Sequence, residues 1–258
     1  MDFTFFDLSL STVLILTLVA FLAGVIDAIA GGGGLITIPV LLLAGLEPAQ
    51  ALATNKLQGC AGTLSASYHF IRRKLVNVKE LIPAIIVTAI SSVLGTLLVS
   101  YLDRSLLFKI IPVILIAVAI FFLLLNKIQP YISSRIQLKK LSFAFIIGGS
   151  FGFYDGLIGP GTGAFFTTAY LCFTSATLIT ATANTKVLNA TSNVASLIIF
   201  SFTGYVLWGL GLMMAVGQWL GAQVGSRLVV TKGNIIIRPM VITMCLIISG
   251  KLIYDHWL

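Results

Sequence analysis

The sequence is poor in charged side chains. Only 9% of its 258 residues are Asp, Glu, Lys or Arg, whereas 58% are apolar. Soluble domains carry roughly 25% charged residues, so this composition does not provide enough polar side chains to cover a water-exposed surface. The composition excludes a soluble globular protein and predicts an all-α, polytopic membrane protein.

The groups that carry most enzymatic and metal chemistry are also scarce. The three cysteines, Cys60, Cys172 and Cys245, stand apart from one another inside apolar segments, and the chain has two histidines. No Cys/His cluster predicts a metal site, and no HExxH or Walker A motif occurs. We therefore expect no catalytic residue, no metal and no cofactor.

Basic residues outnumber acidic ones, giving a formal net charge of +8. They gather in the segments 72–79, 127–140 and 227–238, which separate apolar stretches. The positive-inside rule places such segments in the cytoplasm, and nothing in their pattern predicts nucleic-acid binding. The N-terminus is acidic, with Asp2 and Asp7, and lacks the basic region of a secretory signal. Its first apolar stretch is therefore expected to remain as a transmembrane helix.

Eight apolar stretches are long enough to cross a bilayer, which takes about 20 residues. Two shorter stretches, 34–46 and 162–174, reach only about 20 Å as helices and either cross thinly or re-enter. The eight long stretches are 9–30, 49–71, 78–101, 104–126, 138–158, 176–203, 206–230 and 236–255.

An internal repeat divides the chain into halves at 1–130 and 131–258. The run Gly24-x-x-Asp27-x-x-x-Gly31 recurs 128 residues later as Gly152-x-x-Asp155-x-x-x-Gly159. Lys56 and Gly95 then match Lys186 and Gly225 at an offset of 130. If the short stretches cross, each half has five passes and the repeats are inverted, as the basic loops favour; if they re-enter, the repeats are parallel.

Glycine runs at membrane depth are the first unusual feature. Residues 31–34 are all glycine, and their counterpart is Gly159-Pro160-Gly161-Thr162-Gly163. Each glycine costs a helix about 1 kcal/mol relative to Ala, so we expect a break followed by a short helix. The free N–H groups of that helix suit an anion. This makes Gly32, Gly33, Gly161 and Thr162 binding candidates, unless the glycines serve close helix packing instead.

Two lysines inside polar helices are the second feature. Helical spacing puts Lys56 on one face with Gly59 and Thr63, and Lys186 on one face with Asn189 and Asn193. An ammonium and neutral donors are what a small oxyanion requires. Asn55, Gln58 and Asn184 lie close by in the sequence and complete the candidate substrate site. Alternatively, the lysines reach the headgroups by snorkelling, or pair with acidic residues.

The acidic partners are Asp27 and Asp155, each four residues before a glycine break. A carboxylate in the last turn of a helix opposes the helix dipole, so a compensating group is expected. Either the two carboxylates brace the broken backbone, or they carry coupled protons.

The set of motifs resembles one known family. Gly-x-x-Asp-x-x-x-Gly-Gly-Gly-Gly-x-x-x-x-Pro from Gly24 to Pro39, followed by Ala-Thr-Asn-Lys at 53–56, resembles the sulfite exporter TauE/SafE family. The resemblance covers nearly the whole chain, because the second half carries related patterns. It departs there, since Pro160 and Thr162 interrupt the glycines and Asn184-Thr185 reverses the order Thr54-Asn55.

The resemblance implies a prokaryotic inner-membrane permease with duplicated halves and sulfur-containing anions, such as sulfite or sulfoacetate, as substrates. We therefore expect a secondary transporter with its site at the repeat interface. An anion channel and a non-transporting scaffold remain the alternatives. The partners expected are a small anion and membrane lipids, with a homodimer left open.

Overall fold

The computed structural model describes residues 4–5, 8–132 and 137–229, and these are almost entirely helical. A pair of two-residue antiparallel strands, β1 (Thr4–Phe5) and β2 (Leu8–Ser9), was not predicted from the sequence. The described helices are α1 (Leu10–Ala30), α2 (Gly34–Leu43), α3 (Pro48–Arg72), α4 (Val78–Ser100), α5 (Arg104–Ile132), α6 (Lys140–Phe143), the π-helical turn η1 (Ala144–Gly148), α7 (Gly149–Leu157), α8 (Thr162–Phe173), α9 (Leu178–Thr203) and α10 (Trp208–Val229).

These helices coincide with the predicted apolar stretches to within a few residues, except that α5 runs further than expected. The predicted stretch 138–158 is the uninterrupted succession of α6, η1 and α7. Local signals explain the helix starts: Ser9 caps α1 by accepting from Thr12 N, and Glu47 and Gln50 form a reciprocal capping box before α3. The predicted stretch 236–255 lies outside the described residues.

The distribution of polarity is that of a membrane protein. Among the described residues, two helices, α1 and α4, are long and apolar enough by this measure to cross a bilayer, with mean hydropathy 2.6 and 2.3. Large apolar side chains face outward, among them Leu14, Leu18, Ile86 and Ile90, which are 52–61% exposed. Charged and amide side chains on α3 and α9 are buried instead. Apolar residues outside and polar residues inside are the arrangement that a lipid solvent favours.

Helices of one half pack mainly on helices of the other half. In the first half α1 packs on α10, and in the second half α7 packs on α4, while α3 lies against both α9 and α10. Glycines allow close contact at equivalent points of the two packed pairs. A Cβ at Gly225 would lie 2.4 Å from Val25 O, and one at Gly95 would lie 2.1 Å from Phe153 O. These residues match at the repeat offsets, so the same contact is built twice.

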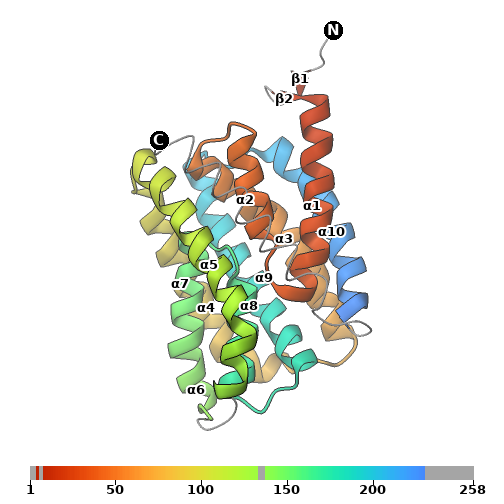
Figure 1. Ribbon diagram of the computed structural model, residues 1–258, viewed down its shortest axis with the longest axis vertical. Helices are drawn as coiled ribbons and strands as arrows, with labels where there is room; N and C mark the ends of the chain where they lie inside the picture. Colours follow the sequence, from red (N-terminus) through yellow and green to blue (C-terminus); the bar gives the residue numbers. More distant parts are fainter. Residues whose placement is uncertain (1–3, 6–7, 133–136, 230–258) are drawn as a thin grey trace.

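Figure 1 shows the course of the corresponding helices. α1 starts beside β2 at the top of the view and runs downward, whereas α6 starts at the bottom and leads up into α7. Several of the described basic residues lie at this lower end, whereas Arg104 at the start of α5 pairs with Glu47 at the opposite end. Lys140 at the start of α6 pairs with Glu80 at the start of α4 at 2.8 Å. Arg72 and Arg227, at the ends of α3 and α10, line one pocket.

The close helix contacts predict a sharp difference between two glycines of α7. A Cβ at Gly156 would lie 2.0 Å from Ser92 O, whereas at Gly149 its neighbours are 3.7 Å away or more. We expect Gly156→Ala to lower the free energy of unfolding by about 1–3 kcal/mol, because the helices must separate. Gly149→Ala should leave it unchanged or raise it slightly. Denaturant titration in detergent micelles measures both, and equal behaviour of the two variants would contradict the packing described here.

Candidate functional site

The two glycine breaks meet at the centre of the molecule. α1 ends at Ala30, and Gly31 continues in the left-handed region with φ 76°. In the second half Gly161, with φ 80°, precedes α8. A Cβ at Gly31 would lie 2.3 Å from the carbonyl carbon of Gly163, so the two breaks touch backbone to backbone. A side chain at this contact would force the halves apart, which is why glycine is required.

Each buried lysine pairs with the aspartate of the other half. Lys56 Nζ, on α3, lies 3.0 Å from Asp155 Oδ1 and donates to Asp155 O at 2.5 Å. Lys186 Nζ, on α9, lies 3.1 Å from Asp27 Oδ2 and also donates to Asp27 O. The two lysines are 2% and 1% exposed, so neither reaches the headgroups. The geometry agrees with the pairing interpretation and not with snorkelling.

The pairs compensate the ends of the broken helices. Each lysine binds both the carboxylate and the backbone carbonyl of an aspartate in the last turns of α1 or α7, where the helix dipole is negative. Asp27 Oδ1 accepts from Gly33 N at 3.2 Å, which ties the carboxylate to the break as well. Asp155 Oδ2 accepts from Ser192 Oγ. Of the two interpretations of the aspartates, bracing of the broken backbone agrees with the contact of Asp27, whereas the Asp155 carboxylate contacts α3 and α9.

A small cavity of about 30 Å³ lies between these elements, roughly the space of one water molecule. Both halves contribute to its wall. The two lysines are not in the lining, but each binds an aspartate that is. Its lining consists of Asp27, Gly31, Gly34, Asn55, Gly59, Thr63, Asp155, Gly159, Gly161, Gly163, Asn189, Asn193 and Gln218.

Amide groups around this cavity are incompletely bonded. The buried atoms Asn189 Oδ1, Gln218 Oε1 and Gln58 Oε1 accept no hydrogen bond from the described residues. Gln58 Nε2 donates to Asn55 Oδ1 at 2.9 Å, and Thr37 Oγ1 donates to the same oxygen at 2.6 Å. Buried amides without partners are costly. They give the cavity unused polar groups for a ligand.

Most of the predicted residues come together here. Thr63, Asn189 and Asn193 share the cavity, as the helical spacing predicted. Gly33 N donates to Asp27 Oδ1 and Gln58 Nε2 donates to Asn55 Oδ1, so each is hydrogen-bonded to a residue of the cavity wall. Thr162 caps its own turn, donating to Gly159 O at 2.7 Å, and Gly32 accepts from Leu35 N at 3.1 Å at the start of α2.

Asn184 does not join them. It lines a separate pocket of about 370 Å³ with Asn77, Glu80 and Lys140, at the basic end. The residue equivalent to Asn55 is Thr185, whose hydroxyl bonds Thr167 at 3.1 Å just as Asn55 bonds Thr37. The reversed order Asn184-Thr185 puts the amide about 100° further round the helix, away from the centre.

Two residues at the site were missed from the sequence. Ser192 bonds Asp155, and Gln218 brings an amide from α10 to the cavity. Gln218 is 3% exposed and follows a mostly apolar run in α10, and a buried amide in an apolar span is a usable signal. Ser192 carries no comparable signal, because serines are common in membrane helices.

Comparison with known proteins assigns the family. The profile of the family described as sulfite exporter TauE/SafE matches residues 16–252. The chain is 47% identical to the probable membrane transporter protein YfcA of Escherichia coli over 251 residues, covering 95% of this chain and 93% of that protein. It is 42% identical to probable membrane transporter proteins of Haemophilus influenzae, over 97% and 98% of the two chains, and of a Sinorhizobium species, over 96% and 95%.

No solved structure is similar enough to count as a match. The chain belongs to the TauE/SafE family of membrane transport proteins.

The buried pairs predict a large cost for removing one partner. Lys56→Met leaves the Asp155 carboxylate, which is 4% exposed, without its cation, and we expect a loss of about 3–5 kcal/mol of unfolding free energy. Lys56→Met with Asp155→Asn should recover a large part of this loss. Denaturant titration of the three chains in detergent micelles measures the difference.

The matched control is Arg104→Met, which removes one partner of the exposed pair with Glu47. Its effect should be far smaller, because solvent screens that pair. A Lys56→Met variant as stable as Arg104→Met would mean that the pair contributes nothing to the fold.

Proposed function

We propose that the protein is a secondary transporter for a small anion, specifically a sulfur-containing oxyanion or organosulfonate of the sulfite or sulfoacetate class. The observation that carries the proposal is the crossed Lys–Asp pairing around a cavity lined by amides from both halves. The family description points to the sulfur class. Named relatives are probable membrane transporters.

The proposal includes two inverted repeats, at 1–130 and 131–258, that form one transmembrane unit. α1 runs in the opposite direction to its counterpart, α6 with α7, and this supports the inversion (Figure 1). So do the equivalent contacts of α1 with α10 and of α7 with α4. Inverted repeats around broken helices with a site near the midplane are a common design of secondary transporters.

Substrate binding follows from the chemistry of the pairs. A sulfonate or sulfite group offers three oxygens on one face, which matches an ammonium together with several amide N–H donors. The candidate donors are Lys56, Lys186, Asn55, Asn189 and Asn193. A cavity the size of one water molecule is too small for such an anion. Binding therefore requires the halves to move apart, as alternating access demands.

The charges at the centre suggest the coupling ion. The buried charged residues in the described part of the chain are two lysines and two aspartates, which sum to zero. An anion entering this neutral, low-dielectric centre adds an uncompensated negative charge, which is costly. A proton taken up by Asp27 or Asp155 would remove that charge and release a lysine for the substrate. Anion and proton then move together.

The orientation in the inner membrane follows from the basic end. Segments 72–79, 127–140 and 227–238 are proposed to be cytoplasmic, and their described residues lie at one end of the molecule. The excess of Lys and Arg at that end is the positive-inside pattern.

The transport proposal is tested in proteoliposomes loaded with labelled sulfite or a two-carbon sulfonate, with and without a pH gradient. We expect saturable flux that the gradient accelerates. Lys56→Ala and Lys186→Ala should lower it at least about tenfold, because each removes a cation worth roughly 1.5–3 kcal/mol in a charge-assisted bond. Arg104→Ala serves as a matched control that removes an exposed cation.

Flux that does not saturate and ignores the pH gradient would favour an anion channel. Absence of flux for both anions in folded protein would contradict the substrate class. Unchanged flux in the two lysine variants would contradict the site.

A further inference from the structure

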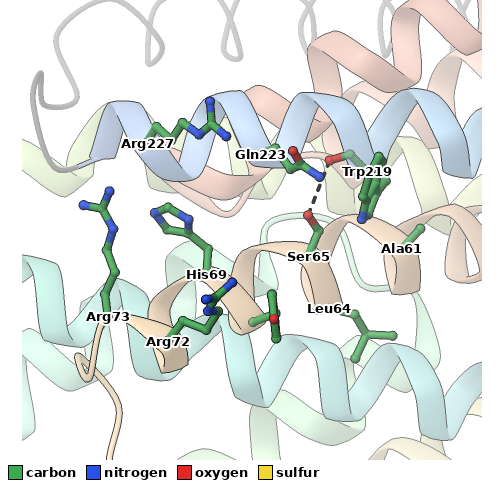
Figure 2. Close-up of a pocket in the computed structure, with 10 residues that line it drawn as sticks. Ala61, Leu64, Ser65, His69, Arg72, Arg73, Trp219, Gln223 and Arg227 are labelled. Atoms are coloured by element: carbon green, nitrogen blue, oxygen red, sulfur yellow. Dashed lines mark hydrogen bonds between the residues drawn. The ribbon is translucent and has the colours of Figure 1, made fainter.

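A third, larger pocket lies on the outside of the molecule, between the C-terminal halves of α3 and α10. Its volume is about 840 Å³, far above that of the central cavity. Figure 2 shows its residues projecting from the two facing helices. Its lining consists of Ala61, Leu64, Ser65, Tyr68, His69, Arg72, Arg73, Trp219, Gln223 and Arg227.

One end of the pocket is apolar and the other end is basic. Figure 2 shows Ala61, Leu64 and Trp219 at one end and the arginines with His69 at the other. Leu64 is 50% exposed and Trp219 45% exposed, so the apolar end opens on the lipid-facing surface. The basic end coincides with the basic end of the whole molecule.

The arginines of this pocket have no acidic partner among the described residues. No carboxylate belongs to the pocket lining, and the ion pairs formed by the described residues involve none of Arg72, Arg73 and Arg227. Arg72 stacks over the Tyr68 ring at 5.6 Å. Three guanidinium groups from two helices therefore line the pocket, with no carboxylate of the described residues to compensate their charge.

We propose that this pocket binds one anionic phospholipid, with its phosphate held by Arg72, Arg73 and Arg227 and an acyl chain lying along Leu64 and Trp219. Arginine forks match phosphate oxygens. Basic pockets between helices at the cytoplasmic interface are suited to anionic headgroups. A free anion would use the arginines but not the apolar wall, so the continuity of the two ends favours a lipid.

Such a lipid would join the two halves of the chain. α3 belongs to the first half and α10 to the second, and both reach the central cavity through Thr63 and Gln218. At the pocket the hydrogen bond between the helices is the long contact of Ser65 Oγ with Trp219 O, 3.5 Å, drawn in Figure 2. The lipid proposal rests on the pocket alone and stands whether or not the anion is a sulfur compound.

The test uses the full chain, purified in detergent, with diphosphatidylglycerol or phosphatidylcholine added at equal concentrations. Native mass spectrometry counts bound lipid, and thermal unfolding reports its effect. We expect preferential retention of diphosphatidylglycerol. Each arginine changed to glutamine should weaken binding about fivefold, and all three together roughly 100-fold.

The matched control changes Lys74, Lys79 and Lys139 to glutamine, which removes the same charge from the same end outside the pocket. It should retain lipid binding. A Leu64→Ala variant should also weaken lipid binding while leaving any interaction with inorganic phosphate unchanged.

Three results would overturn the proposal. They are equal retention of the two lipids by the wild-type chain, an equal loss in the lysine control, and displacement of the lipid by millimolar inorganic phosphate, which would indicate a simple anion site. Single-arginine variants keep the test valid if the triple variant fails to fold.

Discussion

The ammonium groups of Lys56 and Lys186 are the constraint around which this structure is arranged. A lysine inside a membrane protein needs a counter-charge and hydrogen-bond acceptors. Each finds both in an aspartate near the end of a broken helix in the other half. Because the pairing is crossed, neither half satisfies its own buried charges. The two halves must associate for either site to be stable.

The glycine breaks and the close helix contacts follow from this requirement. A lysine reaches the carbonyl of Asp155 or Asp27 only if the helix carrying that aspartate ends at the centre, and Gly31 in the left-handed region marks that end in the first half. The backbones of Gly31 and Gly163 then touch. The central cavity between them is small. The amide N–H groups of residues at its wall, including Asn189, are the donors that we propose an anion would engage.

The sequence predicted the described helices and most residues at the centre, because these depend on local pattern, while the inverted repeat stays a prediction. Hydropathy located the helices, and the spacing of Lys56 and Thr63 predicted their shared face. The pairing itself was one of three open interpretations, since Lys56 and Asp155 are 99 residues apart and local pattern says nothing of such contacts. Asn184 was misplaced because a one-residue exchange with Thr185 turns its side chain away. Gln218 was not predicted, although an amide within a mostly apolar helix is a signal that sequence reasoning can use.

The outer surface also separates apolar side chains from charged ones. Apolar side chains such as Leu18 and Ile90 face outward. Several basic residues lie at one end, where Arg72, Arg73 and Arg227 have no acidic partner among the described residues. We propose that the neutral centre and the cationic end bind different ligands: an anion that moves with a proton at the centre, and a lipid phosphate that stays bound at the end.

The most direct test of the central claim is calorimetric titration of a two-carbon sulfonate into purified wild-type protein and into the Lys56→Met/Asp155→Asn chain. The double variant removes one crossed pair without leaving an unpaired charge, so stability and binding are separated. The account predicts binding to the wild type and at least about tenfold weaker binding to a folded double variant. Equal affinity of the two chains would show that the pair only holds the helices together, and would contradict its place in the anion site.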